Sequence, residues 1–259
     1  MSIAVLRQQL AAVVAGTPSS TPGLPTGFFL LDAMLPGGGI PRGRLTELLA
    51  PAGAGKTTIA RALVTATIRG GGGVAWIDAT RTLDPRDFTP AGTLTMAEVD
   101  ALWVVRPGEP SRGPWCADLL LRSGAFALVV LDSAPVLPRA VAVRLTQLAR
   151  ESDAALLLLG EGTRASEVGG ALRLRLSHPT KPHSGAPRSP GAAAQRIIAT
   201  LEKGGPYTQV ELEVSRGHGI ARRLCTHPEI PDRRGVARTR RHAPPRSARV
   251  AQPDYPVPH

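Results

Sequence analysis

The residues with the clearest chemistry form a glycine-rich loop at residues 50–58, which read APAGAGKTT. A phosphate-binding loop has a Gly, four further residues and then Gly-Lys-Ser/Thr between a strand and a helix. Here Ala50 takes the first place, and Gly-Lys-Thr follows at 55–57. Glycine tolerates the dihedral angles that turn consecutive backbone N–H groups toward an anion. The pattern therefore predicts that this loop holds the phosphates of a nucleotide.

Individual residues of the loop have separate expected roles. Lys56 is expected to bridge the β- and γ-phosphates, and the hydroxyl of Thr57 to bind Mg²⁺. The helix after the loop should place the positive end of its dipole at the same anion. The alternative is an ordinary glycine-rich turn with an incidental lysine. The residues predicted to bind the nucleotide here are Gly53, Ala54, Gly55, Lys56, Thr57 and Thr58.

A second acidic group is needed to hold the metal through water, and Asp132 is the candidate. The apolar segment ALVVLD (127–132) ends in this carboxylate, and open α/β sheets bind ligands at the carboxyl ends of their strands. The predicted metal ligands are therefore Thr57 and Asp132. The alternative is that Asp132 or Ser133 caps the segment that follows.

Alternating strand and helix signals position these residues. Strands are expected at 44–50, 74–79, 101–105, 127–132 and 154–160, and helices at 57–69, 114–122 and 138–150. Strands that are apolar throughout are typical of a parallel sheet covered on both faces. Three later segments alternate between apolar and polar residues and are expected to be antiparallel strands, at 171–177, 195–203 and 207–214. The sequence predicts an α/β fold with a mostly parallel central sheet, helices on both faces and antiparallel strands toward the C-terminus.

The chain divides into four zones by composition. A short amphipathic helix is expected at 1–16, a Pro/Ser/Thr/Gly linker at 17–27, the nucleotide-binding core at 28–215, and a basic, disordered tail at 216–259. Within the core, the Pro-, Ser- and Gly-rich segment 178–194 is expected to be a surface loop.

Charge favours a polyanionic partner. The 259 residues carry a formal net charge of +11, which is typical of proteins that contact nucleic acid. The tail concentrates this charge in Arg233, Arg234, Arg238, Arg240, Arg241, Arg246 and Arg249. It could bind single-stranded DNA without sequence preference, fold against a protein partner, or simply remain solvated.

Neither a secretion signal nor a membrane span is expected. The first residues lack a basic cluster followed by an apolar core, and no apolar run approaches the roughly 18 residues that a span requires. Cys116 and Cys225 are not arranged as a disulfide framework or a zinc site, so both are expected to be reduced. These features predict a cytoplasmic protein, with association with the nucleoid as a further option.

In order and spacing, several segments resemble the RecA recombinase family. They are GGGIPRGRLTELL (37–49), the loop APAGAGKTT, GGVAWIDATRTLDP (72–85), ADLLLRSGAFALVVLDS (117–133) and GGALRLRLS (169–177). The segment LPTG…LDAMLPGGGIPRGRLTELL resembles the ImuA family, RecA-like accessory proteins of inducible mutagenesis, more closely still. The resemblance covers about residues 24–214.

The resemblance implies ATP and Mg²⁺ as cofactors, with Asp84 near the adenine. Phe88 stands one position late for the family's stacking aromatic residue. The family's recombinases polymerise on single-stranded DNA, and an N-terminal element docks on the neighbouring subunit. Residues 1–16 are therefore expected either to dock in this way, so that subunits associate, or to cover the protein's own core.

The chain departs from the family at positions that matter for hydrolysis. Thr80 stands where recombinases have a Glu that orients the attacking water, and a hydroxyl is not a carboxylate base at neutral pH. Asp78 is expected on the same strand face and is the candidate substitute. Gly160 and Glu161 replace the amide that senses the γ-phosphate, and the segments corresponding to both DNA-binding loops are short. No catalytic residue is assigned.

These observations predict an ATP-binding accessory protein of DNA repair and the SOS response. It would support translesion synthesis with weak or no ATP hydrolysis, and its expected partners are RecA and a translesion polymerase-like protein, with single-stranded DNA at the tail. The alternative is an active DNA-dependent ATPase or recombinase. A third interpretation, a P-loop kinase of a small molecule, is disfavoured by the segment order and by the lack of an evident arginine lid.

Overall fold

The computed structural model describes residues 21–88, 94–162, 172–178, 194–203 and 208–215. The predicted helix at 1–16, the interior of the loop predicted at 178–194 and the predicted tail at 216–259 lie outside these residues. The interpretations placed on those three segments stay predictions.

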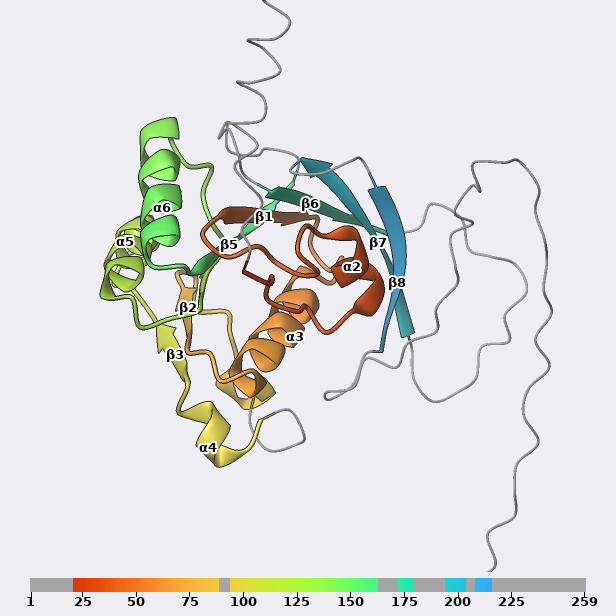
Figure 1. The fold of residues 1–259 in the computed structure, drawn as a ribbon, viewed down its shortest axis with the longest axis horizontal. Helices are drawn as coiled ribbons and strands as arrows, with labels where there is room; N and C mark the ends of the chain where they lie inside the picture. Colours follow the sequence, from red (N-terminus) through yellow and green to blue (C-terminus); the bar gives the residue numbers. More distant parts are fainter. Residues whose placement is uncertain (1–20, 89–93, 163–171, 179–193, 204–207, 216–259) are drawn as a thin grey trace, which may run out of the picture. The chain divides into compact units, whose positions relative to one another are not determined.

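An eight-stranded sheet runs through the described residues (Figure 1). Its strands are β1 (Leu45–Ala50), β2 (Val74–Asp78), β3 (Leu102–Val105), β4 (Leu128–Asp132), β5 (Ala155–Glu161), β6 (Leu172–Ser177), β7 (Ala194–Lys203) and β8 (Thr208–Ser215), in the spatial order β3-β2-β4-β5-β1-β6-β7-β8. Neighbours pair in parallel from β3 to β6, and β7 and β8 are added in antiparallel pairing. The predicted fold class is confirmed.

One prediction about strand direction is corrected at β6. The alternating segment at 171–177 was expected to be antiparallel, but β6 pairs in parallel with β1, with Thr46 opposite Leu172. It pairs in antiparallel fashion only with β7, on its other side. Alternation in sequence reports that one face of β6 is less covered than the other, and the burial of its residues alternates accordingly. It carries no information about direction.

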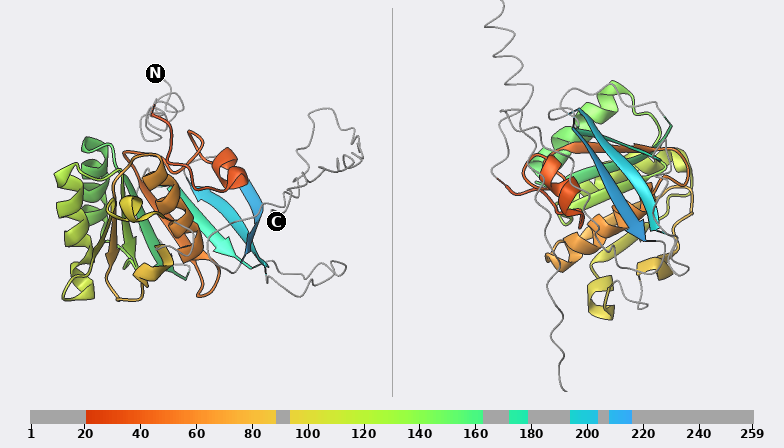
Figure 2. Two further views of the ribbon diagram at one scale, coloured as in Figure 1. Left: turned by 90° about the horizontal axis from the view of Figure 1, so that it is seen from below. Right: turned by 90° about the vertical axis from the view of Figure 1, so that its right-hand side faces the viewer.

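Helices cover the two faces of the sheet (Figure 2). The covering helices are α2 (Phe29–Met34), α3 (Lys56–Arg69), α5 (Gly113–Ser123) and α6 (Arg139–Glu151). The short helix α4 (Met96–Val99) has no buried residue, and 3₁₀ turns lie at Pro85–Phe88 and Pro110–Arg112. The sequence predicted α3, α5 and α6 and missed α2 and α4, which are only 6 and 4 residues long. Among the described residues, no helix has the length and apolar character to cross a bilayer.

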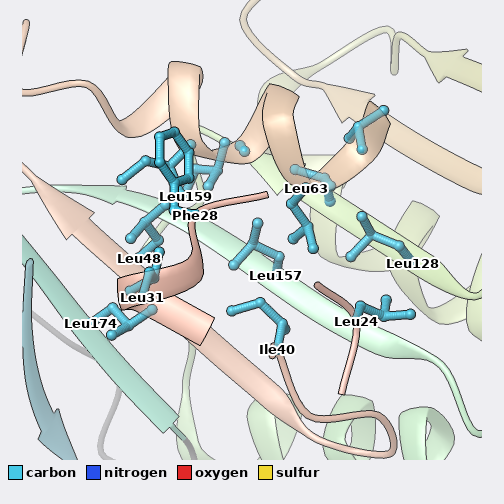
Figure 3. Packing of buried hydrophobic residues seen from close by; sticks show 14 of the residues in the cluster. Leu24, Phe28, Leu31, Ile40, Leu48, Leu63, Leu128, Leu157, Leu159 and Leu174 are labelled. Carbon is cyan, nitrogen blue, oxygen red and sulfur yellow. The ribbon is translucent and has the colours of Figure 1, made fainter. Parts of the chain in front are cut away.

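Two apolar cores lie on opposite faces of the sheet. One packs α2 and α3 against it, and Figure 3 shows Leu63 of α3 with Leu157 of β5, and Leu31 of α2 with Leu48 of β1. The other packs α5 and α6 against the opposite face through residues such as Leu121 and Leu145. Strands β1, β2 and β4 are buried along their whole length. A strand covered on both faces is fixed in position, so the residues at its carboxyl end are fixed as well.

The thiol of Cys116, on α5, is expected to react slowly in the folded protein. The residue is 8% exposed, and burial raises the pKa of its thiol above the usual value, so less of it is the reactive thiolate near neutral pH. A Cys225→Ser variant isolates this thiol. We expect alkylation by iodoacetamide at pH 7.5, followed by mass spectrometry, to be roughly tenfold slower than in urea. Equal rates in both conditions would contradict the packing of α5.

Candidate functional site

The predicted phosphate loop connects β1 to α3, as the sequence indicated. Gly53 and Gly55 have φ angles of 76° and 84°, in the left-handed region that favours glycine. Helix α3 begins at Lys56, and its first turn contains Thr57 and Thr58, both exposed. The N–H groups of a first helical turn have no acceptor within the helix, so they are available to an anion.

One expected donor of the loop is used internally. The N–H of Ala54 donates to the carbonyl of Pro51 at 3.2 Å, and the Ala54 side chain is fully buried. The N–H of Ala54, one of the residues predicted to bind the nucleotide, is therefore directed within the loop. This hydrogen bond instead closes the turn that shapes the loop.

The loop has space on one side and tight packing on the other. A Cβ added at Gly53 would have no atom within 4 Å, whereas one at Gly55 would lie 2.1 Å from Cδ1 of Ile197. Ile197 is a fully buried residue of β7. The loop is thus pressed against β7 at Gly55 and open at Gly53, which fits a cradle whose open side receives a phosphate.

Lys56 is held by the carboxyl end of β5. Its Nζ donates to the carbonyl oxygen of Gly160 at 3.5 Å and lies 3.7 Å from Oε1 of Glu161. The side chain of Lys56 is only 10% exposed, whereas that of Glu161 is 69% exposed. The ammonium group is therefore positioned by two oxygens from the end of one strand.

Asp132 lies in the predicted position for a metal ligand, at the end of β4. It is 6% exposed, and the N–H of Ser133 donates to its Oδ1 at 2.7 Å. Burial raises the pKa of its carboxyl, while the Ser133 N–H and the positive charge of Lys56 oppose this rise. Lys56 of the phosphate loop is therefore near enough to Asp132 to interact with it electrostatically.

The indole of Trp76 adds a buried donor beside this carboxylate. It lowers the pKa of Asp132, yet its Nε1 is buried without a hydrogen bond of normal geometry. Trp76 is fully buried, so its indole N–H faces the Asp132 carboxylate from inside the core and favours the charged form of that carboxyl.

Thr80 lies just beyond β2, at the same edge of the sheet. The strand ends at Asp78, and the exposed Thr80 hydroxyl is 3.2 Å from the hydroxyl of Ser133, the residue after Asp132. It is also 3.2 Å from the hydroxyl of Thr82. The hydroxyl at this position therefore faces the same edge as the candidate metal ligand.

The carboxylate of Asp78 is occupied by hydrogen bonds within the protein. Its side chain is fully buried and accepts hydrogen bonds from the N–H groups of Thr82 at 2.9 Å and Leu83 at 3.3 Å. Nε of Arg106 donates to it at 3.0 Å, and Nη2 of Arg106 donates to the carbonyl of Leu83 at 2.8 Å. Asp78 and Thr80 were expected to share one face of the strand. That expectation does not hold, because Thr80 lies in the turn after the strand. The geometry favours Asp78 as an anchor for the turn rather than as a base.

Replacing Asp78 by Asn is expected to lower the free energy of unfolding by about 3 kcal/mol. The variant leaves Arg106 without its charged partner. Because the side chain of Arg106 is half exposed, the loss of stability should lie near the lower end of the range for broken buried ion pairs. Urea denaturation would measure it. The control is Asp153→Asn, which breaks the exposed pair with Arg42 and should cost less than about 1 kcal/mol. If both variants lost equally little, Asp78 would not be the structural anchor inferred above.

The two residues expected near the adenine do not form a stacking platform. Asp84 is paired with Arg86 at 2.9 Å, and the hydrogen bonds from Arg86 lower the pKa of its carboxyl. Phe88 is 1% exposed, with its ring 6.0 Å from the ring of Trp76 and 5.4 Å from the guanidinium carbon of Arg61. A base cannot stack on a ring that is covered in this way.

Sequence reasoning missed a buried ion pair in the strands beside the loop. Glu47 of β1, 2% exposed, lies opposite Arg173 of β6 and pairs with its Nη2 at 3.0 Å. The available signal was a single charged residue within the apolar run LTELLA (45–50). Such a residue needs a partner, but its partner is 126 positions away.

Comparison with known proteins identifies the family. The sequence model described as RecA N-terminal domain matches residues 11–147, more than half of the 259 residues. Proteins named Protein RecA align over 118 residues, with 43% identity in a Nocardioides species and 42% in Mycobacteroides abscessus and in Salinispora tropica. Each alignment covers 45% of this chain and 33% of the relative, so the chain spans about a third of the length of these curated relatives. On the extent of the family match, the chain belongs to the RecA family.

Proposed function

We propose that this chain is an ATP-binding member of the RecA family that acts as an accessory protein in DNA repair. In this proposal it binds ATP with Mg²⁺, hydrolyses it slowly or not at all, and supports translesion synthesis in the SOS response through protein contacts, as ImuA-like proteins do. The observation that carries it is the hydroxyl of Thr80, 3.2 Å from Ser133, where recombinases have a carboxylate.

The residues at the sheet edge fit a Mg-nucleotide. Lys56 and the N–H groups at the start of α3 would hold the phosphates, and the open side at Gly53 leaves room for them. The exposed hydroxyl of Thr57 and the buried carboxylate of Asp132 supply the oxygen ligands that Mg²⁺ prefers. When bound, the metal would neutralise phosphate charge.

Two further residues belong to the proposed nucleotide site. Thr58 lies in the first turn of α3, and Asp84 is proposed to contact the base.

Weak hydrolysis follows from the groups around the predicted γ-phosphate. A threonine hydroxyl does not remove a proton from water near neutral pH, so general-base catalysis is missing at Thr80. Asp78 does not replace it, because three donors occupy its buried carboxylate. No other carboxylate is assigned as a base.

An accessory role rather than recombination is supported by the short connections beyond β4 and β5. Between Asp132 and β5 the chain forms helix α6 (Arg139–Glu151) and short joining segments. Only ten residues, 162–171, separate β5 from β6. The resemblance to recombinases places their DNA-binding loops in these two intervals, so little chain is left for a DNA groove.

An active DNA-dependent ATPase or recombinase is the second candidate. The similarity to proteins named Protein RecA, at 42–43% identity, favours it. In that case a neighbouring subunit would supply the missing base, the chain would polymerise, and single-stranded DNA would be bound by more than the arginines of the tail.

Nucleotide binding and hydrolysis by the full chain, with and without single-stranded DNA, separate the two candidates. We expect saturable binding of Mg-nucleotide, slow hydrolysis without stimulation by DNA, and no strand exchange. Rapid DNA-stimulated hydrolysis with filament formation would establish the second candidate instead. At the cellular level, loss of the chain should reduce damage-induced mutagenesis while homologous recombination persists. The reverse pattern would contradict the accessory role, including the proposed contacts with RecA and a translesion polymerase-like protein.

A further inference from the structure

The carboxylate of Glu161 lies beside Lys56, the residue that would meet the outer phosphates of a nucleoside triphosphate. Parallel pairing of β1 and β5 puts Glu161 opposite Ala50, where the phosphate loop begins. Its Oε1 is 3.7 Å from Nζ of Lys56. The cation that would meet the outer phosphates therefore already faces a carboxylate.

This carboxylate affects the γ-phosphate more than the β-phosphate. A lysine of this loop type reaches between the β- and γ-phosphates, so a group that pairs with it from the strand end competes with the outer phosphate. Like charges a few ångströms apart repel each other strongly enough to change an equilibrium tenfold or more. A nucleoside diphosphate ends one phosphate earlier and meets less of this repulsion.

The loop itself has little freedom to relieve the repulsion. Gly55 is packed against Cδ1 of Ile197, so that even a single added carbon would clash, and Ile197 is fully buried in β7. The side chain of Glu161 is 69% exposed and can rotate into solvent, but doing so breaks its contact with Lys56. Solvent screening of such an exposed group keeps the effect moderate.

We propose that Glu161 is a specificity-determining residue that makes this cradle prefer a nucleoside diphosphate to the corresponding triphosphate. The inference rests on the proposed function, because it requires a nucleotide at the loop. It goes further in giving the site a resting ligand: the chain would hold the diphosphate unless the triphosphate is in clear excess.

Calorimetric titration of the full chain with Mg-ADP and with the Mg complex of a non-hydrolysable imido analogue of ATP tests the proposal. We expect the wild type to bind the diphosphate about tenfold more tightly than the triphosphate analogue. Glu161→Gln, which keeps the shape and removes the charge, should bind the analogue about tenfold more tightly than wild type while changing ADP binding less than about threefold. The matched control is Glu151→Gln, an exposed residue at the end of α6, which should behave as wild type.

The outcomes separate this inference from the proposed function. If both ligands bind and Glu161→Gln leaves their ratio unchanged, the role of Glu161 is wrong while nucleotide binding stands. If Glu151→Gln changes the ratio as much as Glu161→Gln, the effect is one of overall charge, and the assignment to Glu161 is again wrong. If neither ligand binds the wild type at millimolar concentration, the proposed function fails and this inference fails with it.

Discussion

Replacing Lys56 by Ala is expected to weaken binding of Mg-ADP about 100-fold. The side chain is 10% exposed and its ammonium is fixed by the end of β5, so it is positioned before any ligand arrives. Its removal takes away a charge-assisted contact and also leaves the carboxylate of Glu161 beside the phosphates without its paired ammonium group. Calorimetry on the full chain measures the loss.

A matched control removes the same charge from the opposite edge of the sheet. Lys203 ends β7 and pairs in register with Arg173, whereas Ile197 near the start of β7 touches the phosphate loop. We expect Lys203→Ala to retain binding within about threefold of wild type. An equal loss in the two variants would mean that binding follows the net charge of the chain and that the loop is not the site.

The fold was predictable because its signals are local. Segments such as ALVVLD are apolar without interruption, and the corresponding strand β4 is buried at every residue, as a strand covered on both faces must be. The helix predicted from residue 57 begins at Lys56, because the glycine loop leaves few alternatives for its start. Alternation indicated the later strands, but the direction of β6 depends on which neighbours it meets, which the sequence pattern does not contain.

The candidate site was predictable in its positions and much less so in its contacts. The loop motif indicated Lys56, the end of an apolar strand indicated Asp132, and the resemblance to recombinases indicated Thr80. The partners that decide their chemistry come from distant segments: Glu161 for Lys56, and Arg106 for Asp78. The side chains of Trp76 and Arg61, which cover Phe88, also come from other segments of the chain. Residue types and local periodicity do not specify such long-range pairs.

Replacing Thr80 by Glu is expected to raise the rate of ATP hydrolysis about 100-fold at saturating Mg-ATP. The hydroxyl it replaces is exposed and lies 3.2 Å from Ser133, so a longer carboxylate side chain at this position can reach a water held at the edge beside Asp132. General-base catalysis is commonly worth two to four orders of magnitude, that is ~10²–10⁴-fold. Steady-state phosphate release by the full chain measures the gain.

The control for this gain is Thr82→Glu, which adds the same charge two residues along, at a hydroxyl 3.2 Å from that of Thr80. It should leave hydrolysis at the wild-type rate, because a general base must reach the attacking water and not merely add negative charge nearby.

Combining Thr80→Glu with Glu161→Gln should keep the higher rate and reach it at lower ATP concentration, since the second change acts on binding of the triphosphate. If both Thr80→Glu and the double variant bind nucleotide but hydrolyse it no faster than wild type, the missing carboxylate is not what limits hydrolysis. The slow step would then lie in the shape of the cradle itself, which the packing of Ile197 against Gly55 holds in place.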